Sequence, residues 1–240
     1  MKNKFFKITF LVVALATTFS SCEKDDNSNS KKSNFTRPEE YIENPSVKHA
    51  VKDSRIPVYH GDNPPALAGK YLTNGEVEDA SYIFQSLIGL PVISEFELYN
   101  QTTSGKISFR EKVEGITVSG TGGYITGNNG RFTIYGESRQ SGSEAGLPND
   151  ISLNVVVLMS GSKLSNGDLT VKGISIISDI TTTNKQYNTE GIEGSWWMWE
   201  ADFDLQTGIR SSIIRLENAK TDQSMRNIMR EVIEKITKQE

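Results

Sequence analysis

The fold of this chain is decided by residues 151–180, which read ISLNVVVLMSGSKLSNGDLTVKGISIISDI. The run from Ile151 to Met159 is almost continuously apolar and rich in valine, which predicts a central strand. Asn166-Gly167 follows, a dipeptide that favours a hairpin turn. The stretch from Leu169 to Ile180 is again rich in isoleucine. We therefore expect two adjacent antiparallel strands here, and similar signals recur in the rest of the chain.

Shorter strands are predicted on both sides of this hairpin. Apolar and polar residues alternate at Ile107–Arg110, Ile116–Ser119 and Phe132–Gly136, which is typical of half-buried strands. Asn128-Asn129-Gly130 predicts a second hairpin turn. Segment 82–88 fits neither the strand nor the helix period. Further strands are expected at residues 67–72, 93–98, 196–205 and 209–216.

About eight to ten short strands without a βαβ rhythm predict a mostly β domain with an antiparallel sheet. A barrel and a β-sandwich both remain open. The chain then changes character, because apolar residues recur at three- and four-residue spacing from Met225 to Ile236. This spacing predicts a C-terminal amphipathic helix at about 222–238, with Asp222 as its N-cap. Its polar face carries both signs of charge, so we expect it to pack on the sheet rather than lie on a membrane.

The amino terminus predicts export. Three lysines precede an apolar run, Ile8–Ala16, which is too short to span a bilayer because a spanning helix needs about 20 residues. Ser20-Ser21 then precede Cys22, the only cysteine of the chain. We expect residues 1–21 to be a signal peptide. The segment resembles a bacterial lipobox, which implies that Cys22 carries lipid and anchors the mature chain to a membrane.

The polar stretch after the signal peptide predicts a flexible tether over residues 22–44, ahead of one folded domain at 45–240. The tether opens with the acidic run Glu23-Lys24-Asp25-Asp26. This run resembles the export signal of Bacteroidota-type surface lipoproteins. The resemblance implies a lipid anchor in the outer membrane with the domain exposed at the cell surface, and a periplasmic-facing anchor is the alternative.

A barrel of short strands followed by a helix resembles the lipocalin or calycin layout, which implies a container for a small molecule. The family's opening Gly-x-Trp motif has its nearest counterpart in Gly69-Lys70-Tyr71, where Tyr stands in place of Trp. Segment Pro64–Tyr71, together with Phe132–Tyr135, also resembles uncharacterised lipoproteins of the same bacterial group. That group carries no activity that transfers to this chain.

Residues for catalysis or metal binding are scarce. His49 and His60 are the only histidines, and neither has the partners that a metal site or a catalytic triad requires. Gly120–Gly123 precedes a strand rather than a helix, so we expect a turn or bulge and no phosphate site. We expect no enzyme activity, cofactor or metal ion. The net charge of −4 and the lack of a basic stripe argue against a nucleic-acid partner.

The last long strand holds the candidate ligand-binding residues, which are Trp196, Trp197, Trp199, Glu200 and Asp202. Side chains alternate along a strand, so two faces are expected. The first face, expected in the core, consists of Trp197, Trp199, Ala201, Phe203 and Leu205. The second, expected toward solvent or a lumen, consists of Trp196, Met198, Glu200, Asp202 and Asp204.

Three functions are compatible with these features. The first is a membrane-anchored module that binds a small apolar ligand or a glycan at the cell envelope. The second is a non-catalytic interaction or structural component of the envelope with a filled core. The third and least expected is a hydrolase that pairs Glu200 with Asp202 or Asp204, because two carboxylates suffice for glycoside hydrolysis. Asp202-x-Asp204 is also a weak calcium-binding pattern.

Overall fold

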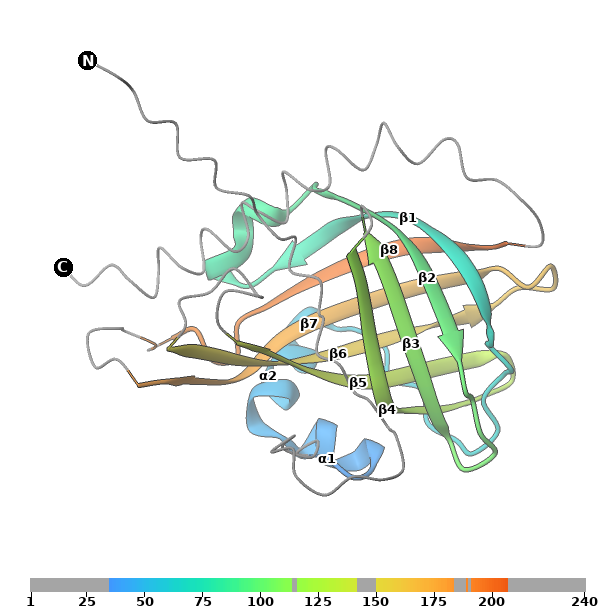
Figure 1. The fold of residues 1–240 in the computed structure, drawn as a ribbon, viewed down its shortest axis with the longest axis horizontal. Helices are drawn as coiled ribbons and strands as arrows, with labels where there is room; N and C mark the ends of the chain where they lie inside the picture. The colour runs from blue at the N-terminus through green and yellow to red at the C-terminus, as the bar shows by residue number, and fades with distance from the viewer. Residues whose placement is uncertain (1–34, 114–115, 142–149, 184–188, 190, 207–240) are drawn as a thin grey trace, which may run out of the picture.

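The computed structural model describes residues 35–113, 116–141, 150–183, 189 and 191–206. Within these residues, eight antiparallel strands follow one another around a closed barrel, and the first strand pairs with the last (Figure 1). This closed strand order confirms the predicted mostly β antiparallel fold. It also shows that the fold is a barrel and not a sandwich. Such up-and-down closure leaves no unpaired sheet edge.

The strands are β1 (Gly69–Ala80), β2 (Pro91–Tyr99), β3 (Lys106–Val113), β4 (Ile116–Asn128), β5 (Arg131–Ser141), β6 (Ile151–Lys163), β7 (Leu169–Thr182) and β8 (Trp196–Leu205). The described helices are α1 (Pro38–Glu43), α2 (Pro45–Ser54) and the 3₁₀ segment η1 (Tyr82–Leu87). The expected strand at 209–216 and the helix at 222–238 lie outside the described residues.

Both predicted hairpin turns are confirmed. Asn129 and Gly130 adopt φ angles of 54° and 79°, the left-handed pair that a tight turn between β4 and β5 requires. Gly167 has a φ of 94° between β6 and β7, and Leu164 N donates to Asp168 O at 2.8 Å. The glycine-rich run in β4 forms the expected bulge, because the β3–β4 register shifts between Ile107 and Phe109.

One end of the barrel is closed by the segment before β1. Leu67 is fully buried, and the Tyr71 hydroxyl donates to its carbonyl at 2.7 Å. Gln101, between β2 and β3, accepts from Leu67 N at 2.8 Å and donates to Pro65 O at 2.9 Å. These bonds satisfy backbone groups at and near the buried Leu67, which otherwise would lose their hydrogen bonds to water.

The folded part begins before the predicted boundary at residue 45. Residues 35–44, predicted as tether, include α1, and Tyr41 is buried at 1% exposure. Helices α1 and α2 pack outside the barrel, where α2 contacts β7 (Figure 1). They form a second apolar core with outward side chains of β5 to β8, which include Ile174, Ile176, Trp196 and Met198.

Local signals explain why α2 forms. Asn44 caps the helix, since its side-chain oxygen accepts from Ser46 N at 3.0 Å and Val47 N at 3.2 Å. Pro45 occupies the first turn, where the missing N–H costs nothing. Val47 and Ala50 are spaced to face the barrel together.

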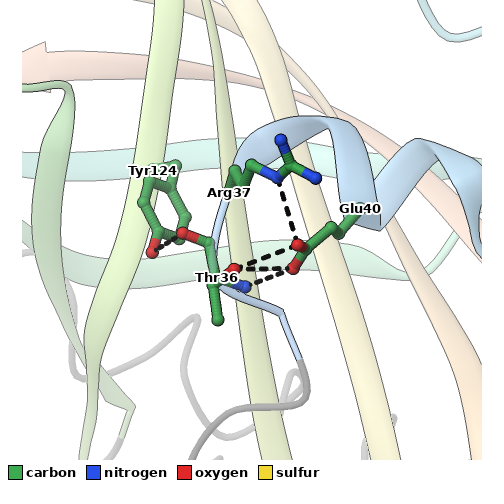
Figure 2. A network of polar contacts seen from close by, with 4 residues as sticks. All are labelled: Thr36, Arg37, Glu40 and Tyr124. Carbon is green, nitrogen blue, oxygen red and sulfur yellow. Dashed lines mark hydrogen bonds and ion pairs between the residues drawn. The ribbon is translucent and has the colours of Figure 1, made fainter.

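A network of hydrogen bonds and one ion pair connects the start of α1 with β4 (Figure 2). The Tyr124 hydroxyl of β4 donates to the Thr36 carbonyl. The Glu40 carboxylate accepts from Thr36 N and Thr36 Oγ1, and Arg37 Nε lies 3.2 Å from Glu40 Oε1. These contacts hold the pKa of Glu40 below its ordinary value, chiefly through the backbone hydrogen bond from Thr36.

No helix in the described part of the chain is long and apolar enough to cross a bilayer.

Candidate functional site: a cavity inside the barrel

The barrel interior is not completely filled. A cavity of about 120 Å³ lies toward the end of the barrel that carries η1. Its wall comes from six strands and the turn before β2. The lining side chains are Thr73, Val77, Leu90, Pro91, Val92, Ser94, Phe96, Phe109, Glu111, Val157, Met159, Ser175, Trp197, Trp199 and Phe203.

Aromatic rings form much of this wall. Phe96 stacks on Phe109 with ring centroids 5.8 Å apart and meets Phe203 edge-on at 5.2 Å. Trp199 lies nearly parallel to Phe203 at 6.3 Å. These separations are favourable for aromatic pairs. The rings contact one another and therefore form a continuous aromatic part of the wall.

Segment η1 covers the cavity end of the barrel. Phe84 is fully buried and meets the Trp197 ring edge-on at 5.1 Å. Val77 binds the turn after η1 through two backbone bonds of 2.8 Å, donating from N to Leu90 and accepting at its oxygen from Gly89. Phe84 thus packs η1 against Trp197 in the cavity wall.

Glu111 is the only ionisable residue among the described side chains that line the cavity. It lies opposite Phe96 in the β2–β3 pair, so both side chains point inward. Burial raises the pKa of its carboxyl above the ordinary value of 4.5, and a hydrogen bond with the Ser94 side chain opposes the shift. Ser94 Oγ in turn lies 2.8 Å from Thr73 Oγ1.

The residues predicted from β8 divide between the two faces of the strand. Trp197 and Trp199 line the cavity. Trp196 and Met198 point outward and belong to the core under α2. The expected alternation is confirmed. The lumen lies on the face of Trp197 and Trp199, not on the face of Trp196 and Met198.

The acidic residues of β8 lie on the outer surface. Glu200 Oε2 is 2.7 Å from Lys172 Nζ, which is also 3.1 Å from Glu78 Oε2. The hydrogen bond from Lys172 is the main reason that the pKa of Glu200 is lowered. Asp202 and Asp204 are exposed. The barrel wall therefore separates the carboxylates of Glu200, Asp202 and Asp204 from the cavity.

Glu111 is absent from the candidates predicted from the sequence, although the sequence carries a signal for it. Ile107, Phe109 and Glu111 share one face of β3 because side chains alternate along a strand. The first two are buried apolar residues, so the carboxyl follows them into the interior. A charged residue on the apolar face of a strand is the unusual feature.

The other polar candidates lie outside the barrel. His49 is exposed and its Nδ1 is 2.9 Å from Asp53 Oδ2, within one turn of α2. His60 is also exposed. The described residues contain no group of histidine, cysteine and carboxylate side chains that could hold a metal ion. Cys22 lies outside the described residues.

Comparisons with protein-family models, curated proteins and solved structures find no match for this chain. The cavity and its lining are therefore the basis for a functional assignment.

Proposed function

We propose that the protein is a membrane-anchored binding protein whose β-barrel holds a small apolar molecule at the cell envelope. The cavity inside the barrel carries this proposal. Protein interiors are close-packed, and a void of this size costs stability on the order of 3 kcal/mol, at about 24 cal/mol per Å³. A ligand that fills the void recovers the lost contacts and so offsets the cost of the void.

The lining favours an apolar ligand over a glycan. Its polar side-chain groups among the described residues are Glu111, the hydroxyls of Thr73, Ser94 and Ser175, and the indole N–H groups of Trp197 and Trp199. Thr73 and Ser94 already bond to each other, so few partners remain for the many hydroxyls of a sugar. Engineered apolar cavities of roughly 150 Å³ bind benzene. We therefore propose an occupant of about one ring in size.

The filled-core alternative has less support because the cavity is present. Exposed large apolar side chains among the described residues are few, namely Tyr82 and Ile88 at the two ends of η1 and Leu164 between β6 and β7. Docking surfaces usually present a contiguous apolar patch of several hundred Å². An interaction role would therefore use features other than such a patch.

Native mass spectrometry tests the proposal directly. Residues 23–240, which include every described residue, are purified without detergent and titrated with ethylbenzene and with oligosaccharides. We expect a discrete ethylbenzene adduct that is lost on denaturation and in Val157→Phe, because the larger side chain fills the cavity. The matched control is Thr170→Phe, at an exposed position on the neighbouring strand β7. A bare mass that no apolar probe shifts would overturn the binding function.

We also propose that lipid on Cys22 anchors the barrel to the outer membrane with the domain at the cell surface. The short apolar leader that ends in Ser20-Ser21, together with the acidic run after the cysteine, supports the proposal. We expect Cys22→Ser to move the protein out of the membrane fraction of its host. Protease added to intact cells distinguishes a surface anchor, which it cleaves, from a periplasmic-facing anchor, which it does not reach.

A further inference from the structure

We propose that the cavity selects a small organic cation, an ammonium group carried on an aromatic or alkyl body, with Glu111 as its counter-ion. This inference rests on the proposed binding function and specifies the chemical class of the ligand. It follows from the position of the carboxyl, its lack of a cationic partner among the described residues, and the aromatic wall around it.

Glu111 has no cation to neutralise it in the described part of the chain. Its neighbours in β3, Arg110 and Lys112, point outward, where they approach Glu97 at 3.4 Å and Glu95 at 3.8 Å. Facing Glu111 inside are Phe96 and Ser94 of β2, and its register partner in β4 is Val118. None of these residues titrates or carries charge. The ionised form of Glu111 would therefore be stabilised by a positive charge that the described chain does not supply.

The hydrogen-bonding capacity of the carboxyl is also incompletely used. An ionised carboxylate offers about four acceptor sites. Ser94 supplies one side-chain hydrogen bond and is itself bonded to Thr73. A ligand ammonium group with three N–H donors would fill the vacant acceptor sites and remove the cost of a buried lone charge.

The rest of the lining suits a cation with an apolar body. Phe96, Phe109, Trp199 and Phe203 line the same cavity as Glu111. The faces of aromatic rings attract an ammonium group, and more strongly when water is excluded. The body of the ligand would pack on the aliphatic and aromatic side chains. A cavity of about 120 Å³ limits that body to roughly one ring or a short alkyl chain.

Proton balance gives this inference a distinctive signature. In the empty cavity the raised pKa keeps Glu111 protonated over a wider range of pH. Binding of an ammonium ion pairs it with the carboxylate, and the carboxyl proton passes to solvent. The affinity for an amine should therefore rise with pH, by up to about tenfold per unit, until Glu111 is ionised in the free protein.

Isothermal titration calorimetry with three probes of similar size tests the inference: benzylamine, ethylbenzene and benzoate. Titrations run from about pH 5 to about pH 8, where amines stay protonated. We expect benzylamine to bind at least about tenfold more tightly than ethylbenzene at the upper end, as for a charged hydrogen bond. We expect the affinity for benzylamine to rise with pH and that for ethylbenzene to stay constant.

Glu111→Gln should weaken the binding of benzylamine at least about tenfold. It should change the affinity for ethylbenzene less than about threefold. The matched control Glu97→Gln removes an outward carboxylate on the adjacent strand and should change neither affinity. The comparison of probes in the unaltered protein stands even if a variant fails to fold.

Ethylbenzene binding as tightly as benzylamine at every pH would overturn the cation inference and leave the binding function intact. Preferential binding of benzoate, strongest at low pH, would also overturn it, since Glu111 would then act as a neutral hydrogen-bond donor. If no probe binds at all, the proposed function itself fails.

Discussion

Trp199 lies directly opposite Gly173 in the β7–β8 pair, and its indole ring occupies the space that a side chain at position 173 would need. A Cβ at Gly173 would overlap the six-membered ring of the indole. The glycine therefore lets Trp199 lie flat against β7 at the cavity wall. This relationship links a single small residue to the shape of the proposed binding site.

We predict that Gly173→Ala destabilises the barrel by about 1 to 3 kcal/mol, the usual cost of overpacking, and weakens ethylbenzene binding. The added methyl group pushes Trp199 toward the cavity or off its rotamer. Urea unfolding followed by tryptophan fluorescence measures the loss. Ser175→Ala, the next inward position on β7, removes an atom instead and should cost less than the glycine substitution. Equal stability of Gly173→Ala and the unaltered protein would contradict the packing described for Trp199.

We predict that Glu111 makes the free energy of unfolding fall as pH rises. Its pKa is raised in the folded state, so the folded protein binds the proton more tightly than the unfolded chain does. The contribution is complete below the ordinary value of 4.5 and is lost as pH climbs through the folded pKa. Urea unfolding of Glu111→Gln over the same pH range should lack this component. If the difference between the two proteins is flat with pH, Glu111 is not desolvated.

We predict that Glu200→Gln leaves benzylamine and ethylbenzene binding unchanged. Glu200 lies on the outer surface, paired with Lys172. Its side chain is 45% exposed, so the lost ion pair should cost less than about 1 kcal/mol. Because its pKa is lowered, the contribution is present above the ordinary pKa and disappears as pH falls through the folded value. A loss of binding in this variant would move the site to the acidic face.

We predict that Tyr41→Ala costs about 3 to 5 kcal/mol, as for other buried aromatic truncations. Tyr41 is 1% exposed and stacks on Phe35 with ring centroids 4.3 Å apart, beside Tyr124 and Tyr135 of the barrel. Thermal or urea unfolding measures the change. Tyr82→Ala, at a tyrosine that is 82% exposed, is the matched control and should change stability by less than about 0.5 kcal/mol. Similar costs for both variants would mean that α1 contributes little to the fold.

The strands and turns were predictable because their signals are local. The alternation in β8 identified the inward face of Trp197, Trp199 and Phe203. Asn129-Gly130 and Asn166-Gly167 identified two hairpins through the left-handed backbone that each turn needs. The α2 signals are also local, with Asn44 as cap and Pro45 in the first turn, although the polar composition of residues 22–44 predicts a tether that includes Asn44.

By itself, the sequence determined a mostly β chain of antiparallel strands with known inward residues, since the period of a strand is a property of neighbouring positions. Tertiary structure decided the closure of β1 onto β8, which joins residues as distant as Tyr71 and Leu205. It also decided the cavity, because an internal void is the small difference between the barrel volume and side chains from six strands. Only that closure placed Glu111 beside the aromatic wall without a cationic partner among the described residues, and so turned one charged residue in a strand into a candidate site.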